Sequence, residues 1–135
     1  MNPKAVELQR RTQKFATDII AFCERLAPNA AVRKIVDQLL DSAGATHSNY
    51  RATCRAKSSA DFISKIGTAV EEADESKGWL ELLVSSNMTT MEEAGALIQE
   101  ADELTAIFVK SKKTAERNKQ NREAIEDQLR NRRRK

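Results

Sequence analysis

The side chains best suited to chemistry gather at the end of the chain. Residues 110–135 hold eleven Lys and Arg against four acidic residues, a formal charge of +7. The preceding 109 residues hold 12 basic and 16 acidic residues, a charge of −4. An acidic body with a basic tail is typical of proteins that meet a polyanionic partner. The candidate phosphate-binding cations are Lys110, Lys112, Lys113, Arg117, Lys119, Arg122, Arg130, Arg132, Arg133, Arg134 and Lys135.

The chemistry available to this tail is limited to charge. Ile125 and Leu129 are its only sizeable apolar residues beyond residue 110, and no aromatic platform accompanies the cations. Nucleic-acid binding would therefore depend on phosphate contacts, weaken with salt and discriminate poorly between sequences. These residues do not indicate whether RNA or DNA is bound. The small apolar face argues against a membrane surface. A solubilising tail without any partner is an alternative of similar weight.

A second group of cations lies in the middle of the chain. Arg51 and Arg55 are four residues apart, so both project from one side of a helix. If the chain turns near Lys57, Asp61 comes opposite Arg55, and an ion pair there would stabilise the corner by about 0.2 to 1 kcal/mol. This structural interpretation is favoured. The alternative is a basic patch that combines Arg51, Arg55, Lys57 and Lys65.

Residue patterns for catalysis or metal binding are missing. The only histidine, His47, lies beside an apolar helical stripe, where histidines are usually packed or hydrogen-bonded. Gly44 occupies the position three residues earlier, so the Glu-x-x-His pair of di-iron bundles is absent. The acidic run of residues 71–75 has no second carboxylate cluster and is interpreted as a solvated helix face. With no phosphate-loop or nucleophile-elbow motif either, we expect no enzyme, no catalytic residues, no cofactor and no metal.

Composition indicates the elements that carry these residues. The chain of 135 residues can bury one modest core, and its four Gly and two Pro favour long helices. Cys23 and Cys54 are far apart and fit a reducing compartment. No signal peptide and no apolar run of membrane-spanning length is present, so we expect a soluble, cytoplasmic protein.

Apolar residues recur at steps of three and four in four segments, the spacing of helices that pack side by side. The stripes are Leu8, Thr12, Phe15, Ile19, Phe22 and Leu26; Val32, Val36, Leu39, Ala43, Thr46 and Tyr50; Phe62, Ile66, Ala69, Ala73, Ser76, Leu80 and Leu83; and Met91, Ala94, Ile98, Ala101, Thr105 and Phe108. They predict an all-α, antiparallel up-down-up-down four-helix bundle over residues 1–109. Residues 110–135 extend the last helix, with a flexible tail over the last six residues. Apolar residues off the stripes, such as Trp79 and Leu97, fit either a wide core or a face that needs a partner subunit.

The segment QLLDSAGATHSNYRATCRAKSSADFISKI, followed by EEADESKGWLELL, carries a family resemblance. It resembles the small four-helix-bundle proteins encoded in intervening sequences of bacterial large-subunit ribosomal RNA genes. Many members have Asn-Ile-Ala-Glu-Gly where this chain has Asn49 to Thr53. The resemblance covers the second and third helices, the outer helices by pattern only, and the tail not at all. The matching positions are Gln38, Leu39, Ser42, Ala43, Ser48, Asn49, Arg55, Ser58, Asp61, Phe62, Glu72, Glu75 and Leu82.

This resemblance implies a protomer that assembles into a ring, commonly a homopentamer, with no known catalytic activity. A protein similar in fold, the accessory protein of diversity-generating retroelements, is a basic pentamer that binds nucleic acid and a reverse transcriptase. Two hypotheses follow for this chain. It is either an oligomeric accessory protein whose basic arms hold RNA or DNA, or a scaffold ring for a protein partner such as a reverse transcriptase or nuclease.

Overall fold

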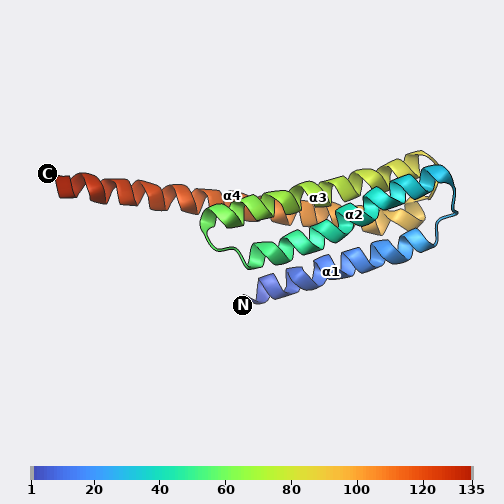
Figure 1. The fold of residues 1–135 in the computed structure, drawn as a ribbon, viewed down its shortest axis with the longest axis horizontal. Coiled ribbons are helices and arrows are strands. Elements are labelled where there is room, and N and C mark those ends of the chain that lie inside the picture. The colour runs from blue at the N-terminus through green and yellow to red at the C-terminus, as the bar shows by residue number, and fades with distance from the viewer. Residues whose placement is uncertain (1, 135) are drawn as a thin grey trace.

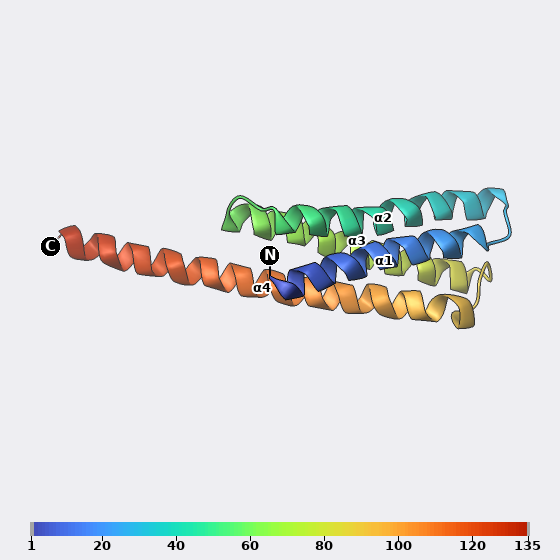
Figure 2. The same cartoon turned by 90° about the horizontal axis from the view of Figure 1, so that it is seen from below.

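A computed structural model describes residues 2–134, in which four helices account for most of the chain and no strand occurs. The helices are α1 (Pro3–Glu24), α2 (Ala30–Cys54), α3 (Ser59–Ser85) and α4 (Met91–Arg134). The all-α, four-helix prediction is confirmed. The α1–α2 and α3–α4 connections lie at one end of the bundle and the α2–α3 connection lies at the other (Figure 1). Helix α4 continues far past the other three helices (Figures 1 and 2).

Side-chain caps fix where the first three helices begin. The Asn2 side chain accepts a hydrogen bond from the Lys4 amide at 2.7 Å, with Pro3 in the first helical position. Asn29 and Ser58 cap α2 and α3 in the same way, at 2.9 and 3.0 Å. Each cap satisfies an amide that has no partner inside its own helix. The predicted Ser58 cap is confirmed.

The corner between α3 and α4 is built around Asn87, the one non-glycine residue among those described with positive φ, at 59°. Asparagine tolerates this left-handed conformation better than most residues. It allows the Met88 amide to donate to the Leu83 carbonyl at 2.9 Å and the Asn87 amide to donate to the Val84 carbonyl at 3.0 Å. These two bonds close the last turn of α3 in a Schellman motif.

The core is one cluster of side chains drawn from all four helices. Tyr50 of α2 stacks on Phe108 of α4, with ring centroids 5.2 Å apart and planes 15° apart. Most stripe positions are buried, but Met91 is 58% exposed because it begins α4 at the end of the bundle. The largest fully buried side chains from the predicted stripes are Phe15, Ile19, Phe22, Leu39, Ile66, Leu80, Leu83 and Phe108, joined by Leu104.

Small residues bring α2 and α3 close together. Ala43, Ala69 and Ala73 are almost completely buried, and the Ser42 and Ser76 hydroxyls lie 2.8 Å apart in a hydrogen bond between the two helices. Helix α3 packs most extensively against α4 and α2, whereas α1 and α4 have the least contact of the neighbouring pairs. The seam between α1 and α4 is therefore the least extensive of these contacts.

Most apolar residues outside the stripes also pack on this core, which supports the wide-core interpretation. Trp79 and Leu97 are half-buried against it, as are Ile35, Leu40, Val70 and Ile107. Leu82 stays 41% exposed. Self-association stays a prediction.

Candidate nucleic-acid interface

The predicted boundary at residue 109 falls inside a continuous helix that stays beside α3 well beyond that point. The Lys112 side chain covers Gly67 of α3, where an added Cβ would lie 3.4 Å from the Lys112 Nζ. Further along, the Arg122 guanidinium donates to the Ser59 hydroxyl at the start of α3. After Arg122, α4 leaves the bundle and remains helical to Arg134 (Figure 1). The flexibility expected of the last six residues stays a prediction.

Helix geometry divides the cations of this segment into two sets. Lys110, Lys113 and Arg117 recur at three and four residues, so they share one face, and all three are exposed. Lys112 and Lys119 lie on the side toward α3 and are half-buried. Lys119 also lies 3.5 Å from Glu123. Within residues 2–134, no carboxylate pairs with any member of the first set.

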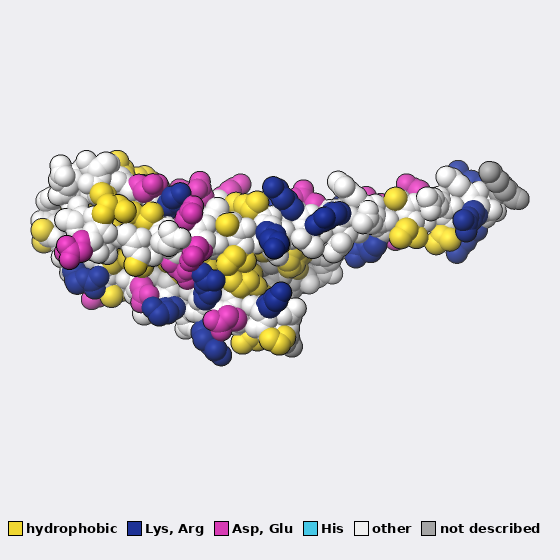
Figure 3. All heavy atoms as spheres, turned by 180° about the vertical axis from the view of Figure 1, so that it is seen from behind, with side chains coloured by type: hydrophobic (Ala, Val, Ile, Leu, Met, Phe, Trp, Pro, Cys, Tyr) yellow, Lys and Arg dark blue, Asp and Glu magenta, His cyan; other side chains and the backbone are white. Residues whose placement is uncertain are grey.

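The end of α4 is more mixed in character. Arg130 pairs with Asp127 one turn earlier. Arg132, Arg133 and Arg134 are consecutive, so they point in different directions around the last turn of the helix. Their positive charges are stabilised by the negative end of the helix dipole. Basic side chains gather visibly at this end (Figure 3). Lys135, also predicted to contact phosphate, lies outside the described residues.

The predicted ion pair between Arg55 and Asp61 is wrong. The Asp61 carboxylate accepts from the Lys65 ammonium at 2.9 Å and from the Lys57 backbone amide at 3.1 Å. Both donors are positioned close to the carboxylate, because Lys65 lies one turn along the same helix and Lys57 lies just before the cap of α3. The Lys65 hydrogen bond, followed by the Lys57 amide, holds the pKa of Asp61 below its ordinary value. Arg55 instead ends α2 as its C-terminal cap residue.

His47 and the two cysteines behave as packed residues. The His47 Nδ1 lies 2.9 Å from the hydroxyl of the buried Thr12, which confirms the hydrogen-bonded role expected of this histidine. Burial, and then the charge of Arg51, lower the pKa of His47. Cys23 and Cys54 are unpaired, and burial raises the pKa of the Cys23 thiol to about 11. A thiol with that pKa is protonated at neutral pH and is a poor nucleophile.

The acidic run of α3 lies on a half-exposed helix face. Burial first, and then the neighbouring Glu75 and Glu71, raise the pKa of Glu72, with a further contribution from Asp41 of α2. Over residues 2–134, no group of three or more His, Cys, Asp or Glu is placed to hold a metal ion. None of the helices within that range is long and apolar enough to cross a membrane.

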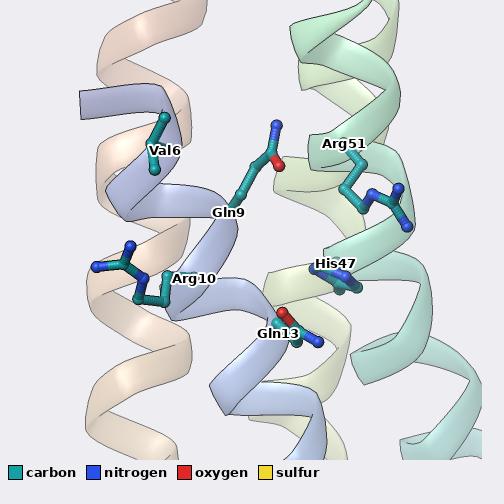
Figure 4. Close-up of a pocket in the computed structure, with 6 residues that line it drawn as sticks. All are labelled: Val6, Gln9, Arg10, Gln13, His47 and Arg51. Carbon is teal, nitrogen blue, oxygen red and sulfur yellow. The ribbon is translucent and has the colours of Figure 1, made fainter. Parts of the chain in front are cut away.

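Two features were missed at the level of sequence. Arg11 of α1 donates twice to Glu100 of α4, at 2.5 and 3.1 Å, and lies 3.6 Å from Glu103. A pocket also lies between α1 and α2 beside His47 and Arg51 (Figure 4). Both combine residues from different helices, so their spacing in the sequence gives no signal. The one signal in the sequence was the four-residue spacing of His47 and Arg51, which places both on one face of α2.

Comparisons with known proteins agree with this fold. A solved structure from Bacteroides thetaiotaomicron VPI-5482, a protein of unknown function from the S23 ribosomal protein family, is 27% identical, with a TM-score of 0.75. The similarity covers 82% of this chain and 98% of that chain. No curated protein matches. The family model described as 23S rRNA-intervening sequence protein matches residues 4–110 and so ends where the basic segment begins. This chain therefore belongs to the 23S rRNA-intervening sequence protein family.

Proposed function

We propose that this chain is a non-enzymatic, oligomeric accessory protein of the cytoplasm that binds RNA or DNA through the phosphate contacts of its basic C-terminal segment. The observation that carries the proposal is the exposed face formed by Lys110, Lys113 and Arg117. Their axial steps are about 4.5 and 6 Å, from the rise of 1.5 Å per residue. Because the three cations lack carboxylate partners among the described residues, phosphate oxygens would meet them without first displacing an ion pair.

The finer architecture of the proposal is an up-down-up-down bundle in a homopentameric ring. The placement of successive connections at opposite ends supports the first part (Figure 1). The family resemblance supports the second. A ring would present five basic arms, and five weak contacts to one nucleic acid would combine into useful avidity.

The test is a titration of labelled single-stranded RNA and duplex DNA, at about 50 and 200 mM salt, a range over which phosphate-driven binding falls steeply. The variant Lys110→Gln/Lys113→Gln/Arg117→Gln should bind more weakly than the unchanged chain. Its salt slope should be smaller by about 2 units for single strands and about 3 for duplex, because three phosphate contacts are lost.

The matched control removes the same charge from the bundle. Lys4→Gln/Lys14→Gln/Lys77→Gln neutralises three cations of α1 and α3, two of which pair with Asp18 and Asp102. This control should keep the affinity and salt slope of the unchanged chain. Equal losses in both variants would show that only net charge matters and would contradict the assignment to α4.

The second candidate function is a scaffold ring for a protein partner such as a reverse transcriptase or nuclease. The acidic face of α3, where burial and then the neighbouring carboxylates raise the pKa of Glu72, favours it because such a face repels nucleic acid. Absence of binding to either nucleic acid at about 50 mM salt would reject the first proposal and favour the scaffold.

A further inference from the structure

A polar pocket of about 380 Å³ lies between the first half of α1 and the second half of α2. Figure 4 shows Gln9 and Gln13 reaching from α1 toward α2, which carries His47 and Arg51. Arg10 turns its guanidinium toward the other side of α1, and Val6 lies at the outer rim (Figure 4). The lining contains hydrogen-bonding side chains and no carboxylate. The volume is in the range of small-ligand pockets, about 300 to 1,000 Å³.

The charges that line this pocket are positive. Some bundle cations pair with carboxylates, as in Lys14–Asp18 at 2.6 Å and Lys77–Asp102 at 3.0 Å, whereas others have no ion pair within residues 2–134. Arg51 has no ion pair within residues 2–134 and is exposed. On a bundle with a net charge of −4, a pocket lined by an unpaired guanidinium, two amides and an imidazole is a local anion-binding environment.

The hydrogen bonds of Thr12 favour one tautomer of His47. The Thr12 hydroxyl has a single hydrogen, and the Gln9 backbone carbonyl, 3.0 Å away, can only accept it. In that arrangement the hydroxyl accepts from the His47 Nδ1 at 2.9 Å, and Nδ1 carries the ring hydrogen. The other ring nitrogen, Nε2, is unprotonated in the neutral ring and becomes a donor only when the ring takes up a proton.

We propose that this pocket binds a phosphate group, held by the Arg51 guanidinium and the amides of Gln9 and Gln13, with protonated His47 as a further donor. The phosphate belongs either to a free phosphate or nucleotide, or to a nucleic-acid backbone. The parts of α1 and α2 that line the pocket lie toward the end of the bundle from which α4 extends (Figure 1). The inference does not rest on the function proposed for α4, because α1 and α2 form the pocket.

Binding should be coupled to proton uptake by His47. Burial and the nearby Arg51 keep the ring neutral near pH 7 in the free protein. A bound anion would offset the Arg51 charge and raise the pKa of His47, so affinity should increase as the pH falls through the ordinary histidine range near 6.5. The charged side chains that line the pocket with His47 are Arg51 of α2 and Arg10 of α1, which pairs with Glu7. Arg11, next to the Thr12 that bonds His47, pairs with Glu100 and Glu103 of α4.

The experiment follows the imidazole signals of the full-length protein by NMR, which is simple because His47 is the only histidine. The protein is titrated with inorganic phosphate, and separately with a single-stranded oligonucleotide, against chloride at equal ionic strength. Phosphate should shift the signals saturably and raise the pKa of His47. Arg51→Gln should weaken the response about tenfold or more, the effect of losing one charge-assisted hydrogen bond. Arg51 is exposed, so this change should leave the fold intact.

Further variants separate the possible outcomes. Lys14→Gln should respond like the unchanged protein. Saturation by phosphate assigns the site to free phosphate groups, whereas saturation by the oligonucleotide alone, lost in Arg51→Gln, assigns it to a nucleic-acid backbone. Lys110→Gln/Lys113→Gln/Arg117→Gln should keep the phosphate response even if it loses nucleic-acid affinity, so the two proposals can fail separately. The inference is overturned if neither ligand shifts His47, or if Arg51→Gln leaves the response unchanged.

Discussion

The two ends of α4 are stabilised by different interactions. From Ala94 to Phe108, the helix buries side chains against all of its neighbours, and its charged residues reach partners on α1 and α3. Beyond Arg122, the ion pairs that involve the helix are between residues three or four apart on its own surface. The region from Ala94 to Phe108 is therefore held by tertiary packing. The last twelve residues are held by local propensity and local charge pairs, which contribute a few tenths of a kcal/mol each. Helix α4 thus joins a region that is packed in the bundle to a region that is exposed to solvent.

The largest test of this difference compares two apolar residues of α4. Phe108→Ala removes a fully buried ring that stacks on Tyr50, so it should lower the free energy of unfolding by about 3 to 5 kcal/mol. Leu129→Ala removes a side chain that is 47% exposed and should change it by less than about 0.5 kcal/mol. Urea denaturation, monitored by circular dichroism, measures the free energy of unfolding of both variants. A comparable loss in Leu129→Ala would show that the extension packs on something in solution.

A smaller effect is expected from two arginine ion pairs. Arg11→Gln breaks a pair of hydrogen bonds that joins α1 to α4 across the least extensive seam, and it should cost about 1 to 2 kcal/mol. Arg130→Gln breaks the pair with Asp127 inside the extension and should cost less than about 0.5 kcal/mol. Thermal unfolding of both variants would settle the order. Equal melting temperatures would mean that α1 is held by its apolar stripe alone.

The smallest effect concerns pH at the α2–α3 corner. The pKa of Asp61 is lowered by Lys65 and the Lys57 amide, so the folded state favours the ionised carboxylate. Its stabilising effect is present above the unfolded pKa, near 3.9, and is lost as the pH falls through the lower pKa of the folded protein. Between pH 5 and 3, the unchanged chain should therefore lose more stability than Asp61→Asn. The matched control, Asp127→Asn, should follow the unchanged chain, and parallel curves for all three proteins would refute this role of Asp61.

Much of the fold was predictable from sequence because a helix repeats its buried positions every three to four residues. Phe15, Ile66 and Phe108 were all placed in the core by that spacing. Met91 was misplaced because a stripe gives no information about which residue lies beyond the end of the neighbouring helices. The Arg55 prediction failed because it ignored two closer donors, the Lys65 ammonium on the same helix as Asp61 and the Lys57 amide just before that helix.

The candidate sites were predictable only in part. Charge composition located the basic segment of α4, but packing against α3 decided which of its cations are free, as the contrast of Lys112 with Lys113 shows. The phosphate pocket depends on how far α1 is shifted along α2, because that register brings Gln9 and Gln13 beside His47. Register between helices is set by side-chain packing, which a single sequence does not display.

The continuity of α4 has a mechanical consequence. A helix of 44 residues is about 66 Å long, and its last twelve residues extend about 18 Å beyond Arg122. A disordered tail would let its cations sample many positions, whereas a helix holds them at fixed distances and directions from the bundle. Any force applied to the end of α4 would also pass along the helix axis to the Phe108 and Tyr50 rings. The extension would then work as a spacer that sets how far the arginines of its last turn lie from the acidic body.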